Sequence, residues 1–238
     1  MKKLFLITLI FLASPVFANY RVQDIDEFST KNFPTNSKKV LFILDFSNSM
    51  NERLHNKRKI ELMLATMYEI IPSLGNDISI GLRVYGHKAG ITPFDACKAS
   101  TLITPIAQNN SYQILNSLQK VKPKGMTPIT YSLKQAIRHD FVGFKGQKHI
   151  ILLTDGGENC DESPCTFAMN LVRTRNDITI DVIAFNIKNE DDIAQLRCTS
   201  MVTSGKFYSA ENTRDLTYSI KKSLENLKTV EAKIIPHY

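Results

Sequence analysis

Hydrophobic positions recur along the chain in two patterns. Val40 to Leu44 is an unbroken apolar run followed by polar residues, and His149 to Leu153 repeats it. Runs of this kind predict strands that are covered on both faces. From Ile60 to Leu74, apolar residues lie three or four positions apart and stop before Gly75, which predicts a helix. We therefore expect the chain to open with a strand, a loop and a helix.

The same alternation continues to the end of the chain. Further strands are predicted at Ile78 to Val84, Thr101 to Ile106, Ile178 to Phe185 and Lys206 to Ala210. Helices are predicted from about Ser111, which can act as a cap, and behind Pro128, which suits a first turn. Three more helices are centred near Ala168, Leu196 and Ile220. This order indicates an α/β fold with a central, mainly parallel sheet and helices on both faces.

The first 18 residues have the features of a secretory signal peptide. Lys2 and Lys3 precede an apolar run from Leu4 to Ala13, and small residues lead to Ala18. We expect cleavage after Ala18 and a periplasmic or secreted protein without a membrane span, because the apolar run is shorter than the roughly 20 residues that a span requires. An uncleaved N-terminal anchor is the alternative.

Length and composition favour one globular domain. Residues 19–37 show no sustained period and are interpreted as a leader segment, 38–228 as the domain and 229–238 as a tail. The chain is 43% hydrophobic and 22% charged, which is typical of a globular protein. Loss of Lys2 and Lys3 lowers the net charge from +7 to +5. Basic residues are dispersed except at Lys57 to Lys59, which we interpret as solvated surface, so no nucleic-acid partner is expected.

The chain contains four cysteines: Cys97, Cys160, Cys165 and Cys198. In an oxidising compartment this even number favours two disulfides over a metal cluster, and the short paired spacings of a zinc site are missing. Three connectivities are open. The loop from Cys160 to Cys165 is the shortest to close, which favours that bridge and would leave Cys97 to pair with Cys198.

Polar side chains follow both unbroken apolar runs. The first run leads into Asp45, Ser47 and Ser49, and the later run leads into Thr154 and Asp155. In a parallel sheet, functional groups gather beyond the carboxyl ends of the strands. We therefore expect Asp45 and Asp155 to lie at one edge of the sheet.

A third hydroxyl group, that of Thr127, is expected at the cap of the helix behind Pro128, and Gly125 would let this loop approach the site. Hydroxyl and carboxylate oxygens suit Mg²⁺ or Mn²⁺, with Ca²⁺ also compatible, and do not suit zinc or copper. Neutral hydroxyl ligands would leave the ion electrophilic. An acidic oxygen from another molecule could then complete the coordination, which would make a metal-bridged docking site.

Five residues form, in order, a recognisable motif: Asp45, Ser47, Ser49, Thr127 and Asp155. The motif resembles the metal-ion-dependent adhesion site of von Willebrand factor A-like (vWA) domains, and the resemblance extends over about residues 38–228. The blocks Gly81 to Gly86 and Lys122 to Gly125 look like those of exported bacterial members. The resemblance implies a Rossmann-like vWA fold, direct binding of the ion by the three hydroxyl residues, and aspartates that act through water. Asn48 departs from the commonest pattern, which has Gly, but its side chain is not a ligand.

Simpler roles remain open for several of these residues. Asp45 and Asp155 could cap helix starts by accepting amide hydrogen bonds, and Ser49 and Thr127 could also be caps. Three acids follow Asp155 in the same loop and are interpreted as solvated: Glu158, Asp161 and Glu162. No function is assigned to the five scattered histidines.

The sequence predicts a binding module and not an enzyme. The module would bind a partner protein through an acidic side chain of the partner that coordinates the ion. One alternative is a structural ion in a subunit of a cell-envelope assembly. A metal-dependent hydrolase is a weaker alternative, because the chain has neither a Gly-x-Ser-x-Gly elbow nor a His-Glu-x-x-His motif.

Overall fold

The computed structural model describes residues 38–75 and 77–230. The expected signal peptide, the leader segment and residues 231–238 of the expected tail lie outside the described residues. The described residues belong to one unit, Asn36–Tyr238. None of its described helices is both long enough and apolar enough to cross a membrane.

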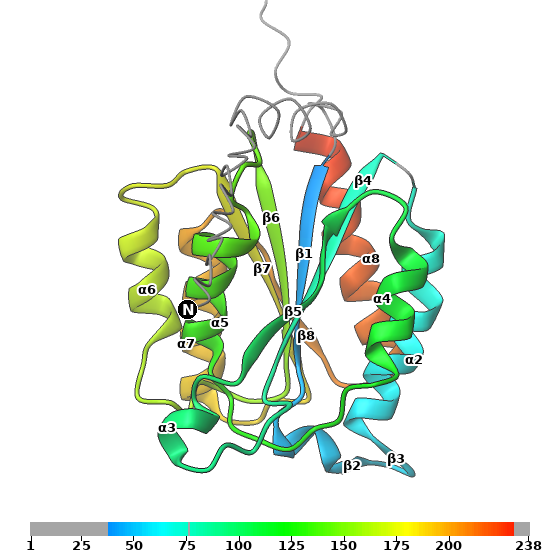
Figure 1. The fold of residues 1–238 in the computed structure, drawn as a ribbon. Coiled ribbons are helices and arrows are strands. Elements are labelled where there is room, and N and C mark those ends of the chain that lie inside the picture. The colour runs from blue at the N-terminus through cyan, green and yellow to red at the C-terminus, as the bar shows by residue number, and fades with distance from the viewer. Residues whose placement is uncertain (1–37, 76, 231–238) are drawn as a thin grey trace, which may run out of the picture. The chain divides into compact units, whose positions relative to one another are not determined.

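A six-stranded sheet forms the centre of this unit (Figure 1). The strands lie in the order β5, β4, β1, β6, β7, β8, and every neighbouring pair is parallel except β4 and β5. Their bounds are β1 Lys38–Asp45, β4 Ile78–Tyr85, β5 Ser100–Ala107, β6 Lys148–Thr154, β7 Ile178–Phe185 and β8 Phe207–Ala210. The predicted α/β fold with a mainly parallel sheet is confirmed.

Helices cover both faces of the sheet, with α2, α4 and α8 on one face and α5, α6 and α7 on the other (Figure 1). Their bounds are α2 Lys59–Ile70, α4 Ser111–Leu118, α5 Ile129–Gln135, α6 Pro164–Leu171, α7 Glu190–Val202 and α8 Thr213–Val230. Shorter elements are η1 Asn48–Asn51, β2 Arg53–Leu54, β3 Lys57–Arg58, η2 Ile71–Ser73, α3 Pro93–Ala96 and the π-helical turn η3 Ala136–Asp140. Helix α8 reaches Val230, so part of the expected tail continues the last helix.

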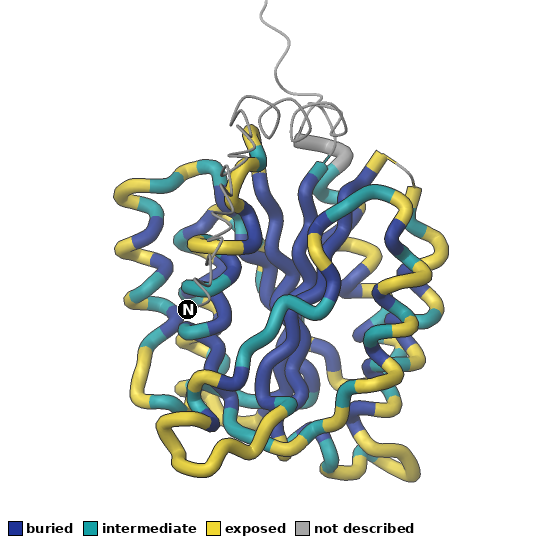
Figure 2. The backbone as a smooth tube through the Cα atoms, in the orientation of Figure 1, coloured by how far each residue is buried: buried dark blue, intermediate teal, exposed yellow. Residues whose placement is uncertain are grey.

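The unbroken apolar run of β1, one of the buried central strands (Figure 2), contributes to two hydrophobic cores. Val40, Phe42 and Leu44 belong to the core under α2, α4 and α8, whereas Leu41 and Ile43 belong to the core under α5, α6 and α7. All five side chains are fully buried. Side chains alternate between the two faces of a strand, so a strand between two helix layers needs apolar residues at every position.

Strand β4 is also buried along its whole length, although polar residues interrupt its sequence. Arg83 occupies one of these positions, and its Nε and Nη2 donate to the carboxylate of Asp140 at 2.6 and 2.7 Å. Its Nη1 also donates to Ser100 Oγ at 2.9 Å. Pairing of this kind allows a charge to occupy an interior position.

Two helix starts differ from the expected caps. The cap position of α4 is Asn110, and Ser111 instead donates to the carbonyl oxygen of Ile71 at 3.3 Å. Helix α5 begins at Ile129 with Pro128 in the cap position, so Thr127, the expected cap, lies one residue before the observed cap. Proline has no N–H group and fits a helix start in which that donor would lack a helical partner.

Two disulfides are present, but the pairing favoured by loop length is wrong. Cys97 is bonded to Cys160 and Cys165 to Cys198, with Cα atoms 5.5 and 5.4 Å apart. Cys165 lies in the first turn of α6, which packs against α7, the helix that carries Cys198. Tertiary packing, which loop-closure entropy does not include, therefore determines the pairing.

Candidate metal site

Three separate stretches of chain meet at the carboxyl edge of the sheet. Strands β1 and β6 are neighbours, so Asp45 and Asp155 leave the same edge. The third stretch arrives through Gly125, which pairs with Ser47 as an isolated bridge. The N–H of Asn48 donates to the carbonyl oxygen of Gly125 at 2.9 Å. The expected convergence of the three stretches is thus present in the backbone.

Glycine is required where these loops cross. Gly125 donates to the carbonyl oxygen of Gly86 at 2.7 Å, and a Cβ atom at Gly125 would lie 2.2 Å from the carbonyl oxygen of Lys88. Gly86 has φ +70°, and a Cβ atom there would lie 2.5 Å from the backbone nitrogen of Ser47. A side chain at either position would push the loops apart.

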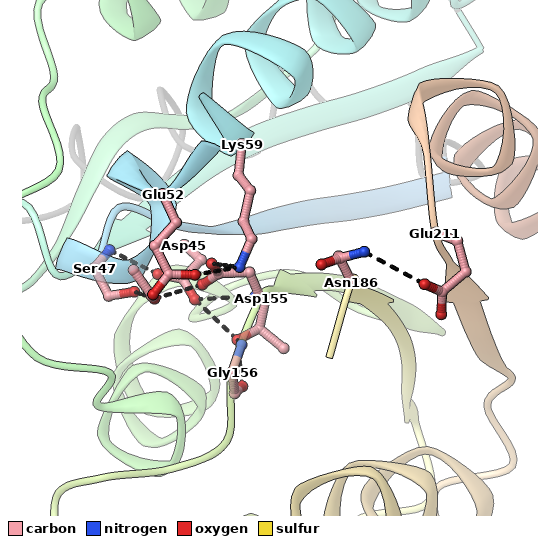
Figure 3. Close-up of polar contacts among 10 residues, drawn as sticks. Asp45, Ser47, Glu52, Lys59, Asp155, Gly156, Asn186 and Glu211 are labelled. Carbon is pink, nitrogen blue, oxygen red and sulfur yellow. Dashed lines mark hydrogen bonds and ion pairs between the residues drawn. The ribbon is translucent and has the colours of Figure 1, made fainter. Parts of the chain in front are cut away.

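Four of the five sequence-predicted residues are joined by hydrogen bonds (Figure 3). Ser49 Oγ donates to Asp155 Oδ1 at 2.6 Å, and the hydroxyl oxygens of Ser47 and Ser49 lie 2.9 Å apart. Asp45 Oδ1 accepts the N–H of Ser47 at 2.6 Å, and Asp45 Oδ2 accepts the N–H of Asp155 at 3.4 Å. Asp45 therefore accepts amide hydrogen bonds, as in the capping interpretation, while its carboxylate stays beside the hydroxyl groups.

The position of Thr127 is set by its backbone, and among the described residues no hydrogen bond joins it to the other four. Its N–H donates to Oδ1 of Asn159, in the loop after Asp155, at 2.7 Å. The residue is buried and lies two positions after Gly125, the residue that pairs with Ser47. The fifth predicted residue thus belongs to the same cluster of loops.

The two carboxylates influence each other. Burial, together with the negative charge of Asp155, raises the pKa of Asp45 to about 6, although hydrogen bonds from Ser47 and Thr154 oppose this shift. Thr154 Oγ1 donates to Asp45 Oδ2 at 2.9 Å. Two acids held this close favour a nearby positive charge.

Lys59 supplies a positive charge that the sequence analysis missed. Its Nζ lies 3.0 Å from Asp155 Oδ2 and 2.9 Å from Glu52 Oε2 (Figure 3). The side chain of Lys59 is only 8% exposed, so its interpretation as solvated surface is wrong. Burial lowers the pKa of Lys59, but the contacts with Glu52 and Asp155 outweigh burial and raise it. The sequence could have indicated that Lys59 is buried, because Lys59 lies four residues before the buried Met63 and so shares its face of the helix.

The acids of the loop after Asp155 differ from one another. Glu158 accepts the N–H groups of Thr130 at 2.7 Å and of Cys160 at 3.0 Å, and burial raises its pKa. Its interpretation as a solvated acid is therefore wrong, because it caps backbone donors beside Thr127. Asp161 and Glu162 are exposed, as expected.

The donor set is compatible with a hard divalent cation. It consists of neutral hydroxyl oxygens and two carboxylates, which is the chemistry that Mg²⁺ favours. Among residues 38–75 and 77–230, no group of three or more His, Cys, Asp and Glu residues could hold a metal. A site here would therefore depend on its serine and threonine hydroxyls. With Lys59 and its second partner Glu52 both counted, the carboxylates of Asp45 and Asp155 leave two net negative charges, which a divalent cation would neutralise.

The fold and the converging loops agree with one protein family. The family model of the von Willebrand factor type A domain matches residues 39–222. The chain therefore belongs to the von Willebrand factor type A domain family.

Two similar proteins come from Bacillus subtilis (strain 168). YwmC is 29% identical over 209 residues, covering 86% of this chain and 87% of YwmC. YwmD is 29% identical over 212 residues, covering 86% of each chain. Both are described as uncharacterized proteins.

Several solved structures share the fold. BatB from Bacteroides thetaiotaomicron has a TM-score of 0.59 at 17% identity, over 78% of this chain and 98% of BatB. Proximal thread matrix protein 1 from the mussel byssus, described with a zinc-occupied MIDAS motif, has a TM-score of 0.61 at 20% identity, over 81% of this chain and 46% of that chain. The PilB minor pilin of Streptococcus sanguinis has a TM-score of 0.61 at 14% identity, over 82% and 63%.

Proposed function

We propose that this chain is an exported binding protein that holds a divalent cation and uses it to bind a partner protein. The cation ligands are Asp45, Ser47, Ser49, Thr127 and Asp155, and an acidic side chain of the partner completes the coordination. The observation that carries the proposal is the hydrogen bond of 2.6 Å between Ser49 Oγ and Asp155 Oδ1, which joins stretches 106 residues apart. Hydroxyl and carboxylate oxygens from distant parts of the chain are gathered at one point.

Mg²⁺ is the ion we assign, with Mn²⁺ or Ca²⁺ as substitutes. The hydroxyl groups of Ser47, Ser49 and Thr127 would bind it directly, and Asp45 and Asp155 would hold it through water. The bound ion supplies a Lewis-acidic position for an incoming carboxylate. With Lys59 and Glu52 both counted the loaded site is neutral, so the open coordination position of the cation is what favours an acidic ligand. The zinc-occupied MIDAS motif of the mussel protein supports a divalent cation in this fold.

The proposal places the protein in the periplasm or outside the cell. Its two disulfides are consistent with an oxidising compartment. The similarity of fold to a minor pilin supports an extracellular role. The expected signal peptide would supply the route of export.

Calorimetric titration with Mg²⁺ tests the site. Thr127→Ala and Asp155→Asn are each expected to weaken Mg²⁺ binding at least about tenfold while the fold persists in circular dichroism, since each removes a ligand. Thr166→Ala, on the exposed surface of α6, and Asp161→Asn, in the same loop as Asp155, are matched controls that should bind normally. Unchanged Mg²⁺ binding in both Thr127→Ala and Asp155→Asn would show that the assignment is wrong.

Thermal unfolding separates recognition from a purely structural ion. A structural ion should raise Tm strongly in the isolated protein, because it binds the native state alone. A recognition ion bound weakly before the partner arrives should raise Tm little at the same concentration. We assign no catalytic role, and detectable Mg²⁺-dependent hydrolysis that is lost in Asp155→Asn would favour the hydrolase alternative.

A further inference from the structure

The loops at the carboxyl edge of the sheet are divided by charge. We call residues 46–58, 86–99 and 119–128 the basic half, and residues 155–163, 186–192 and 211–212 the acidic half. The basic half contains eight Lys and Arg residues against Glu52 and Asp95. The acidic half contains eight Asp and Glu residues against Lys188. The candidate metal site lies on the boundary, because Ser47, Ser49 and Thr127 belong to the basic half, Asp45 directly precedes it, and Asp155 belongs to the acidic half.

Backbone hydrogen bonds join the three loops of the basic half. Phe46 donates to the carbonyl oxygen of Tyr85 at 2.8 Å, and Lys124 donates through its N–H to the carbonyl oxygen of Gly86 at 3.1 Å. Its three loops are thus fixed to one another beside the site. Lys88, Lys122 and Lys124 are exposed, and within the described part of the chain their ammonium groups form no ion pair.

Two exposed apolar side chains project from this surface. Ile91 is 99% exposed and Phe94 is 66% exposed. The ammonium group of Lys98 lies 3.7 Å from the centroid of the Phe94 ring. Exposed apolar residues beside a charged site indicate an interaction surface when the loop that carries them is ordered.

The loop that carries Ile91 and Phe94 is held at several points. Thr92 and Asp95 form a reciprocal capping box at the start of α3. The bridge from Cys97 to Cys160 then fixes the end of α3 to the loop that follows Asp155. A partner that docks here would order little additional chain, which lowers the entropic cost of binding.

We propose that the basic half, with Ile91 and Phe94, docks an acidic segment of a partner protein that has an apolar residue beside its metal-binding acid. This deepens the proposed function and rests on it. The segment's acids would lie over Lys88, Lys122 and Lys124, and its apolar residue would contact Ile91 and Phe94. A flat anionic membrane is a poorer match, because its approach would also bring the acidic half against negative charge.

Fluorescence anisotropy with designed peptides tests this surface. The probe is a short labelled peptide with several Asp and Glu residues around one Phe, titrated with the exported chain in Mg²⁺. Two matched peptides replace its acids with Asn and Gln, or its Phe with Ser. We expect binding of the probe, about tenfold weaker binding after loss of the Phe, and no binding of the neutral peptide. Failure of every acidic peptide to bind would overturn the proposal.

Paired variants locate the surface. Lys88→Glu with Lys124→Glu should weaken binding of the probe about tenfold and reduce its dependence on salt. The control Asp161→Lys with Asp191→Lys, in the acidic half, should bind as well or better. Ile91→Ser with Phe94→Ser should also weaken binding, whereas Tyr112→Ser with Tyr218→Ser, at exposed sites on α4 and α8, should not. If charge reversal in the acidic half weakened binding of the probe as much as charge reversal in the basic half, the proposal would be overturned.

Thr127→Ala and a chelator separate this proposal from the proposed function. If binding of the probe requires Mg²⁺ but is unchanged in Lys88→Glu with Lys124→Glu, the docking surface is overturned and the metal site is retained. Binding that requires the basic half but persists in Thr127→Ala and in chelator would overturn the metal-bridged function. The choice of an acidic partner segment would be overturned if the protein bound phosphatidylglycerol vesicles as tightly as the probe. It would also be overturned if sedimentation showed a dimer that dissociates in Lys88→Glu with Lys124→Glu.

Discussion

Replacing Lys59 with Met is expected to destabilise the metal-free protein and to tighten its binding of Mg²⁺. The ammonium group lies 3.0 Å from Asp155 Oδ2, and the side chain of Asp155 is fully buried. Two unit charges at this distance attract by about 5 kcal/mol at an effective dielectric constant of about 20. Desolvation of the ammonium group offsets part of this attraction. Loss of one partner from a buried pair costs about 3 to 5 kcal/mol, and we expect about 3 kcal/mol for Lys59→Met in the presence of a chelator.

Mg²⁺ should restore much of the loss, because a divalent cation beside Asp155 replaces the missing positive charge and no longer meets the repulsion of Lys59. If about 2 kcal/mol is restored, the variant binds Mg²⁺ about 30-fold more tightly than the parent chain. Urea unfolding in chelator and in saturating Mg²⁺ gives the two stabilities, and calorimetry gives the two Kd values. Lys57→Met, an exposed change two residues away, is the control. An equal stability loss with and without Mg²⁺, together with an unchanged Kd, would refute the reasoning.

Three further changes are expected to affect stability, each measured by urea unfolding. Arg83→Leu should cost about 3 to 5 kcal/mol because it leaves Asp140 buried without its partner, and adding Asp140→Leu should recover part of the loss. Burial and the nearby Lys88 lower the pKa of His87 from 6.5 to about 4. Below pH 6.5 the unfolded chain therefore takes up a proton on His87 that the folded chain does not. The free energy of unfolding should fall by about 1 to 2 kcal/mol between pH 6.5 and pH 4 for this reason. His87→Gln should remove this part of the pH dependence, and an unchanged pH profile would contradict the cause given. Replacing both cysteines of either bridge, which span 63 and 33 residues, should cost about 4 kcal/mol by loop-closure entropy, and a loss below about 1 kcal/mol in both would contradict the chain-entropy account.

The order of strands and helices was predictable because it follows from local periodicity. The apolar run of β1 requires cover on both faces, and the structure provides it. Parallel neighbours then bring Asp45 and Asp155 to one edge without further information. The convergence of Ser47, Ser49 and Asp155 follows from the same geometry.

Features that depend on packing between distant segments were not predictable in the same way. The run from Lys57 to Lys59 has the composition of a solvated surface, and only the phase of α2 turns Lys59 inward. The disulfide pairing depends on which helices lie side by side, a property that loop length does not contain. Glu158 is half-buried because it accepts from backbone donors, among them the N–H of Thr130 in the first turn of α5.

Both disulfides end in the short stretch between Cys160 and Cys165, directly after the loop that carries Asp155. One bond leads to the β4–β5 loop and the other to α7, so this stretch is tethered in two directions. Large swings of this side of the molecule are thereby restrained whether or not anything is bound. Helix α8 and the β2–β3 hairpin contain no cysteine, so neither bridge tethers them.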